Sequence, residues 1–358
     1  MKKIGILCLT LLMLVGCSYS QNSVEEESTG SETSMNSLDD SYYKIINLGG
    51  SELRERFYTD VYSTKDFETI GRDLQILSAK YFPTSSYYMS EGQYFGREEK
   101  YALIRRSSEY SIQPKKGTTI DGVESPVMIS NIHEQDYYVK NGSNYVLKGV
   151  SLAIIVDPTD SLGHTLTTPM SDITIKNYGK GCIEKVYDYI QKTDSETVKK
   201  IKNLPILITI YQATDKTRST LNGKYIYESY CEKQVGSIIE LDHANVILAS
   251  DEAEKMDKTT SSEFGEIKNI LKNEATEAAG LIGEAKYIDG EIQSMIITAN
   301  LNIKTITELQ YLTSIIADNI ESKFTYDFDI KVLVYSQDGL KAIIIKEKGQ
   351  DAKSHMLY

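Results

Sequence analysis

The sequence contains no tryptophan, and only four of its 358 residues are histidine. The histidines lie far apart along the chain, at His133, His164, His243 and His355. This scatter indicates neither a metal-binding cluster nor a histidine-based catalytic triad. Positive charge is also scarce, because 39 Lys and Arg face 51 Asp and Glu and give a formal net charge of -12. Neutralising phosphates needs clustered Lys and Arg, so we expect no nucleic-acid partner.

Cysteine is limited to four positions, which restricts the use of disulfides. Cys8 lies inside an apolar N-terminal run and Cys17 follows that run, so only Cys182 and Cys231 remain for the folded part. Outside the cell these two thiols could pair. A domain of this size needs no disulfide for its stability, which favours two free, buried thiols.

Common catalytic patterns are missing as well. The sequence has no G-x-S-x-G nucleophile elbow and no complete phosphate-binding loop. Ser41-Tyr42-Tyr43-Lys44 fits S-x-x-K, but the S-D-N and K-T-G partners are absent. His133-Glu134 begins like a zinc-protease helix, but Tyr137 stands where the second histidine is required. We therefore predict a protein that is not an enzyme and that has no cofactor and no metal.

The start of the chain carries a lipoprotein signal. Lys2 and Lys3 precede an apolar run from Ile4 to Val15, which is too short for a stable membrane span. The run ends in Leu14-Val15-Gly16-Cys17, the pattern that signal peptidase II recognises through Leu14, Val15 and Gly16. We predict a lipid on the Cys17 thiol and anchoring at the extracytoplasmic face of the cell membrane. Each buried acyl methylene contributes about 0.8 kcal/mol, so two or three chains hold a protein there persistently.

The composition divides the chain into four predicted parts. Residues 1–16 form the signal peptide, and residues 17–41 form a lipidated flexible tether that is too polar to fold. The folded body is predicted to be α+β, with mixed β-sheets packed by helices. It is predicted to contain two related strand–helix–strand repeats, over residues 42–218 and 219–358.

The two repeats are predicted from similar patterns. In the first, apolar strands at 150–156 and 206–211 flank a helix that carries Ile183 and Ile190. In the second, strands at 292–301 and 330–335 flank a helix that starts at a capping box formed by Thr305 and Glu308. Both units close on a tyrosine. A helix capped by Thr64 is predicted before the first strand–helix–strand unit. Another is predicted between the two units, starting at a capping box formed by Thr260 and Glu263 and reaching Leu281.

Several short segments of the body occur together with the lipoprotein start. They are Phe82-Pro83-Thr84, Gly92-Gln93, Ile129-Ser130-Asn131-Ile132 with Glu134-Gln135-Asp136-Tyr137-Tyr138, and Pro205-Ile206 leading to Ile210-Tyr211. Together they resemble the CamS-type sex pheromone lipoproteins of Gram-positive bacteria. The resemblance implies a two-repeat body and a cleaved signal peptide that is trimmed to a short apolar peptide, which prompts plasmid transfer in other cells. The matching peptide here is Thr10-Leu11-Leu12-Met13-Leu14-Val15-Gly16.

The role of the body is left open between three alternatives. The first is an unknown, non-enzymatic role. The second is a surface that binds a peptide or a sugar of the cell envelope on a tyrosine-lined cleft, because the chain has 26 tyrosines. The third is an envelope hydrolase that uses Glu134 and Asp136, which would share one strand face. The polar candidates for a binding site are Ser130, Asn131, Glu134, Gln135, Asp136 and Tyr137.

Overall fold

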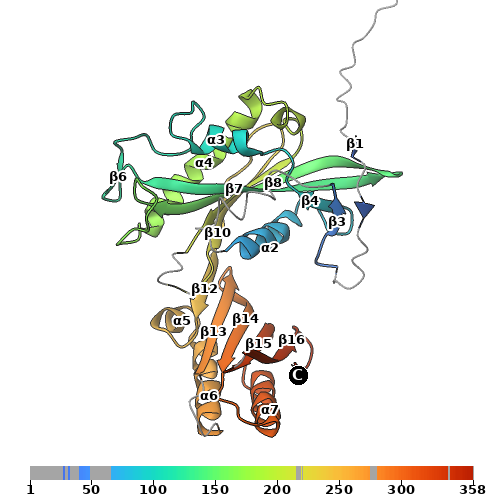
Figure 1. Cartoon of the computed structure of the whole chain (residues 1–358), viewed down its shortest axis with the longest axis vertical. Helices are drawn as coiled ribbons and strands as arrows, with labels where there is room; N and C mark the ends of the chain where they lie inside the picture. The colour runs from blue at the N-terminus through green and yellow to red at the C-terminus, as the bar shows by residue number, and fades with distance from the viewer. Residues whose placement is uncertain are drawn as a thin grey trace, which may run out of the picture.

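Two mixed β-sheets, each with its own hydrophobic core, organise the folded body (Figure 1). The computed structural model describes residues 27–28, 31–32, 40–48, 66–214, 219, 221–274, 280–337 and 339–357. The predicted signal peptide, Cys17, the peptide of residues 10–16 and the Thr64 cap lie outside the described residues. Within them, no helix has the length and apolar character needed to cross a membrane.

The first sheet has nine strands, of which eight follow one another in space. In that order they are β11 (Ile239–Glu240), β10 (Lys224–Cys231), β9 (Ile206–Gln212), β8 (Asn144–Thr159), β7 (Val127–Asn141), β4 (Tyr88–Glu91), β3 (Lys44–Asn47) and β2 (Ser31–Glu32). The ninth, β1 (Glu27–Ser28), pairs with β8, and β5 (Thr119–Ile120) pairs with β6 (Val123–Glu124) in a separate small sheet. The helical elements of this half are α2 (Phe67–Ser78), α3 (Arg97–Ile104), α4 (Asp172–Lys192) and the short 3-10 helix at Val198–Lys200.

Helices cover both faces of this sheet, with α2 on one side and α3 and α4 on the other (Figure 1). Such a sandwich buries its central strands on both faces, and this explains the continuous apolar sequences of β8 and β9. These two strands run parallel, with Val150 beside Ile206, and α4 connects them. The first predicted strand–helix–strand unit is therefore present.

The second sheet has six strands with three helices in the same half. In spatial order the strands are β12 (His243–Ile247), β13 (Gly280–Ile288), β14 (Glu291–Asn300), β15 (Asp329–Ser336), β16 (Gly339–Lys346) and β17 (Lys353–Met356). The helices are α5 (Asp251–Met256), α6 (Lys258–Glu274) and α7 (Ile306–Ser322). Strands β14 and β15 run parallel with α7 between them, as in the second predicted unit. The Thr305 hydroxyl accepts from the Glu308 N–H at 3.1 Å, so the predicted cap of α7 is present.

The two sheets repeat one order of pairings. An antiparallel pair (β7–β8, β13–β14) is followed by a parallel pair (β8–β9, β14–β15) and then by two antiparallel pairs. The predicted α+β class is confirmed, whereas a common origin of the two halves stays a prediction. The predicted boundary at 218/219 falls inside the first sheet, because β10 and β11 pair beyond β9. The sheets divide at residues 241–242 instead.

The predicted tether differs from the structure at two points. Glu27–Ser28 pairs with Tyr145 and Val146 of β8, and Ser31–Glu32 pairs with Ile46 and Asn47 of β3. Composition alone indicated a continuous flexible segment over 17–41. Strand pairing at a sheet edge uses backbone groups and needs no apolar side chain, so composition could not reveal it.

The helix predicted from Thr260 to Leu281 is shorter than its pattern indicated. Helix α6 ends at Glu274, and Leu281 lies on β13. Its start also differs, because the Asp257 carboxylate accepts from the Thr260 N–H at 3.0 Å, so Thr260 lies inside the helix and is not its cap. Leu281 is buried in the same core as the apolar face of α6. The prediction that Leu281 packs with this face was therefore correct, whereas its assignment to the helix was wrong.

Both cysteines of the body, Cys182 on α4 and Cys231 on β10, are free and buried. This agrees with the alternative that the chain length favoured. Burial raises the pKa of Cys182 to about 12, because the apolar surroundings disfavour the thiolate. The thiol is therefore unreactive near neutral pH.

Candidate functional site

The polar segment of β7 places two carboxylates on the sheet face that α3 covers. The Glu134 carboxylate accepts hydrogen bonds from the backbone N–H of Phe95 at 2.9 Å and from that of Tyr94 at 3.2 Å. The Asp136 carboxylate accepts from the Gln93 N–H at 2.9 Å. Both acids are fully buried. The prediction that Glu134 and Asp136 share one strand face is correct.

Burial changes the acidity of Glu134 more strongly than its hydrogen bonds do. Burial raises the pKa of Glu134 to about 7, while the backbone N–H donors of Phe95 and Tyr94 act in the opposite direction. Glu134 and Asp136 are thus buried carboxyl groups that accept hydrogen bonds from the backbone N–H groups of residues 93–95.

This pair gives the protein a specific pH dependence. The usual pKa of Glu134 is 4.5 and its folded pKa is about 7, so the folded state holds a proton in this range that the unfolded state releases. The free energy of unfolding is therefore expected to fall as the pH rises through this range and to level off above it. Glu134→Gln removes this titrating group. The melting temperature of the variant relative to that of the wild type is therefore expected to increase from about pH 5 to about pH 8. A melting-temperature difference that is constant with pH would contradict the raised pKa of Glu134.

The other predicted binding residues do not join these acids on one surface. The Gln135 amide donates to the Gly71 carbonyl of α2 at 2.8 Å, on the opposite face of the sheet, and accepts from the Tyr137 hydroxyl at 3.0 Å. Asn131 bonds to the backbone N–H of the next residue at 2.7 Å, and Ser130 is half-buried. These groups are engaged inside the protein, and they line no described pocket. A hydrolase would need carboxylates that reach a substrate, and Glu134 and Asp136 do not reach the surface.

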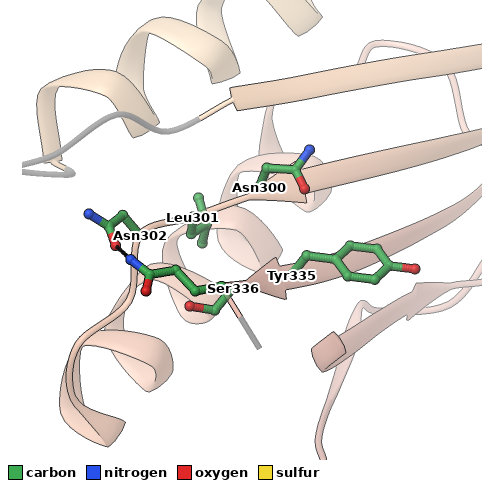
Figure 2. Close-up of a pocket in the computed structure, with 6 residues that line it drawn as sticks. Asn300, Leu301, Asn302, Tyr335 and Ser336 are labelled. Carbon is green, nitrogen blue, oxygen red and sulfur yellow. Dashed lines mark hydrogen bonds between the residues drawn. The ribbon is translucent and has the colours of Figure 1, made fainter. Parts of the chain in front are cut away.

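A described pocket lies instead in the second half, at the carboxyl ends of the parallel strands β14 and β15. Its volume is about 320 Å³. Asn300, Leu301 and Asn302 approach from β14 and the residues after it, and Tyr335 and Ser336 from β15 (Figure 2). Gln337 completes the lining, and its amide donates to the Asn302 side chain at 2.5 Å.

The lining of this pocket contains side-chain amides, hydroxyl groups and one leucine, and no ionisable acid, lysine, arginine or histidine. Amides and hydroxyls both donate and accept hydrogen bonds, so they suit a neutral polar ligand such as a peptide group or a sugar hydroxyl. Sequence reasoning missed this site. The signal was present in the polar residues that directly follow two apolar strands, but only the parallel pairing brings them together. No group of His, Cys, Asp and Glu among the described residues could hold a metal ion.

The family described as CamS sex pheromone cAM373 precursor matches this chain over residues 50–352. The chain belongs to the CamS family. The CamS fold is also seen in the crystal structure of a sex pheromone precursor from Lactobacillus salivarius subsp. salivarius UCC118, at 20% identity and a TM-score of 0.78, covering 92% of this chain and 99% of that one. The C-terminal domain of the sex pheromone staph-cAM373 precursor from Staphylococcus aureus matches at 20% identity and a TM-score of 0.63, covering 82% and 96%. No curated protein matches the sequence.

The segments that resemble the CamS family form two packed units in this chain. In one, Gly92 lies against Glu134, and a Cβ at residue 92 would lie 2.3 Å from the Glu134 carboxylate. In the other, the Phe82 ring covers Gly149 and stacks on Tyr137 with ring centroids 4.6 Å apart. These CamS segments therefore build the core of the first half, and the polar pocket belongs to the second half.

Proposed function

We propose that this chain is a lipid-anchored protein of the extracytoplasmic membrane face and that its cleaved signal peptide yields a short apolar signalling peptide. The observation that carries the proposal is the placement of Leu14-Val15-Gly16-Cys17 before a chain whose residues 50–352 match the CamS sex pheromone cAM373 precursor family. Cleavage before Cys17 releases residues 1–16, and trimming before Thr10 then removes Lys2 and Lys3 and leaves an aliphatic segment without charged side chains.

In this proposal Cys17 carries the lipid anchor, and the residues before it form the signalling peptide. The Cys17 thiol loses its proton and displaces the headgroup phosphate of a membrane phospholipid, which forms a thioether with the diacylglyceryl group. Hydrolysis of the Gly16–Cys17 peptide bond then leaves Cys17 as the new N-terminus. Residues 10–16 carry no charged side chain and five aliphatic or thioether side chains. Such a peptide suits a hydrophobic receptor groove. The body is proposed to have a non-enzymatic role, in keeping with the burial of Glu134 and Asp136.

Replacement of the lipid-accepting cysteine tests the anchor. In a Gram-positive host, Cys17→Ala is expected to abolish incorporation of labelled palmitate and to leave residues 1–16 on the chain. Cys8→Ala is the matched control, because Cys8 lies within the same apolar run and Cys17 remains available. Intact mass and label are measured on both variants. A Cys17→Ala protein that is still labelled and cleaved would disprove the assignment of Cys17.

The signalling part has its own test. The culture medium is searched by mass spectrometry for the Thr10–Gly16 peptide, and the synthetic peptide is added to plasmid-bearing cells while conjugation is counted. A peptide of the same composition in scrambled order is the control. An increase with the native order alone supports signalling. If neither order changes conjugation, the signalling part fails and the lipid anchor is unaffected.

A second candidate function, the capture of a neutral peptide or sugar, is favoured by the polar pocket at the ends of β14 and β15. The lining of the pocket combines Tyr335 with amide groups, a combination that suits both ligand classes. Thermal-shift measurements with neutral cell-wall sugars and short peptides test it. A ligand that raises the melting temperature of the wild type and not that of Gln337→Ala would support the pocket as its site.

A further inference from the structure

The second sheet is covered by helices on one face and exposed on the other. Helix α6 packs on β13, and α7 packs on β16 and β17, over the core that contains Ile297, Val332 and Val334. Side chains alternate between the faces of a strand, so the neighbours of these residues point away from the helices. The face that points away from the helices carries three isoleucines that remain largely exposed: Ile282 (43%), Ile296 (45%) and Ile345 (37%).

Strand register places these side chains on one continuous surface. Thr298 of β14 lies beside Ile282 of β13 on one side and beside Leu333 of β15 on the other, and Leu333 lies beside Ile343 of β16. Leu333 and Ile343 are half-buried. We use "open face" for the surface made by Ile282, Ile296, Leu333, Ile343 and Ile345. Exposed aliphatic groups that are contiguous across four strands are typical of a binding surface.

The polar pocket lies at one end of the open face. Asn300 and Tyr335 are register partners, and each is two residues beyond Thr298 and Leu333 on its strand. Because side chains repeat with period two, Asn300 and Tyr335 point to the same side as the open face. Aliphatic contacts and hydrogen-bonding amides therefore meet on one surface, which suits an extended ligand that has apolar side chains and peptide groups.

The charges on this surface favour an occupant with a free carboxylate over a second copy of the chain. Lys331 lies beside Ile296 and Ile345, and Lys353 pairs with Ile345 from the edge strand β17. Both lysines are exposed, and Glu284 is the register partner of Ile296 on the other side. Two copies meeting through this face would bring lysines together in a desolvated contact, which is unfavourable. An apolar peptide brings no side-chain charge, and its terminal carboxylate attracts a lysine.

We propose that the open face and the adjoining pocket bind the chain's own Thr10–Gly16 segment after its release. Seven extended residues span about 23 Å, and Lys331 lies four residues, about 13 Å, from the pocket residue Tyr335 along β15, so a peptide whose carboxylate is at Lys331 is long enough to reach the pocket. The leucine, methionine and valine side chains lie on the isoleucines, the peptide groups bond to the pocket amides, and the Gly16 carboxylate pairs with Lys331. The proposal rests on the proposed release of this segment, and it gives the body a role as the carrier of its own peptide.

A direct binding measurement tests this proposal with the mature chain from residue 17, carrying Cys17→Ser so that no lipid is attached. Isothermal titration calorimetry with synthetic Thr10–Gly16 is expected to show saturable binding. Ile296→Glu removes an aliphatic side chain from the open face and places a carboxylate beside Lys331, so it should weaken binding by about tenfold or more. Ile306→Glu is the matched control, because Ile306 is 50% exposed at the start of α7 and its replacement is expected to leave binding unchanged. A C-terminally amidated peptide should bind more weakly than the free acid.

Three results would overturn the proposal. They are no saturable binding up to about 1 mM peptide, equal effects of Ile296→Glu and Ile306→Glu, or self-association in sedimentation that Ile296→Glu abolishes. The last result would make the open face an interface between copies of the chain. Because the peptide is synthetic, peptide release in cells can fail while binding succeeds. Conversely, lack of binding leaves the palmitate and conjugation tests intact.

Discussion

Gly92→Ala is expected to lower the free energy of unfolding of the first half by about 2–6 kcal/mol. The added Cβ would lie 2.3 Å from a Glu134 carboxylate oxygen and 2.5 Å from the Glu134 Cβ. No rotation of the Glu134 side chain can move its Cβ, so the backbone of residues 92–95 has to shift. That shift lengthens the hydrogen bonds from the N–H groups of Tyr94 and Phe95 and leaves a buried acid poorly satisfied.

Gly181→Ala provides the matched control for this substitution. Gly181 is exposed on α4, and nothing lies within 4 Å of the position of a Cβ there. Alanine is a better helix former than glycine, so this variant should gain about 0.5–1 kcal/mol. Urea unfolding followed by circular dichroism separates the two outcomes. If Gly92→Ala unfolds at the same urea concentration as the wild type, the carboxylate contact at Gly92 has no energetic importance.

The strands of the parallel pair β8–β9 could be predicted because their sequences leave little choice. Val150–Val156 and Ile206–Tyr211 are apolar runs bounded by Gly149, Asp157 and Pro205, and they form β8 and β9. A strand that is buried on both faces has to be apolar throughout, so the run itself is the signal. The cap of α7 was equally local, because Thr305 and Glu308 are three residues apart.

The candidate sites could not be predicted in the same way, because their partners are distant in the sequence. The sequence placed Glu134 and Asp136 on one strand face, but their donors lie about 40 residues earlier, at Gln93, Tyr94 and Phe95. A dense polar run was interpreted as a binding surface, and it proved to be a buried hydrogen-bonded unit. The polar pocket depends likewise on the pairing of Asn300 with Tyr335, which only the parallel register of β14 and β15 supplies.

Phe82→Ala is expected to cost about 3–5 kcal/mol, the usual range for removing a buried phenylalanine. The ring is 1% exposed, stacks on Tyr137 at 4.6 Å and meets Tyr87 edge-on at 5.5 Å. Its removal therefore leaves a cavity between aromatic side chains. The control is Phe67→Ala at the start of α2, where the ring is 41% exposed and the loss should stay below about 1 kcal/mol.

The contact between Phe82 and Gly149 can be isolated by combining two substitutions. Gly149→Ala alone should destabilise, because its Cβ would lie 2.2 Å from a carbon of the Phe82 ring. In the Phe82→Ala protein the ring is absent, so the same Cβ fits and fills part of the cavity. The double variant is therefore expected to be more stable than the sum of the two losses predicts, by about 1–3 kcal/mol. Additive losses would mean that β8 moves away from the ring at little cost, and the glycine would then have no packing role there.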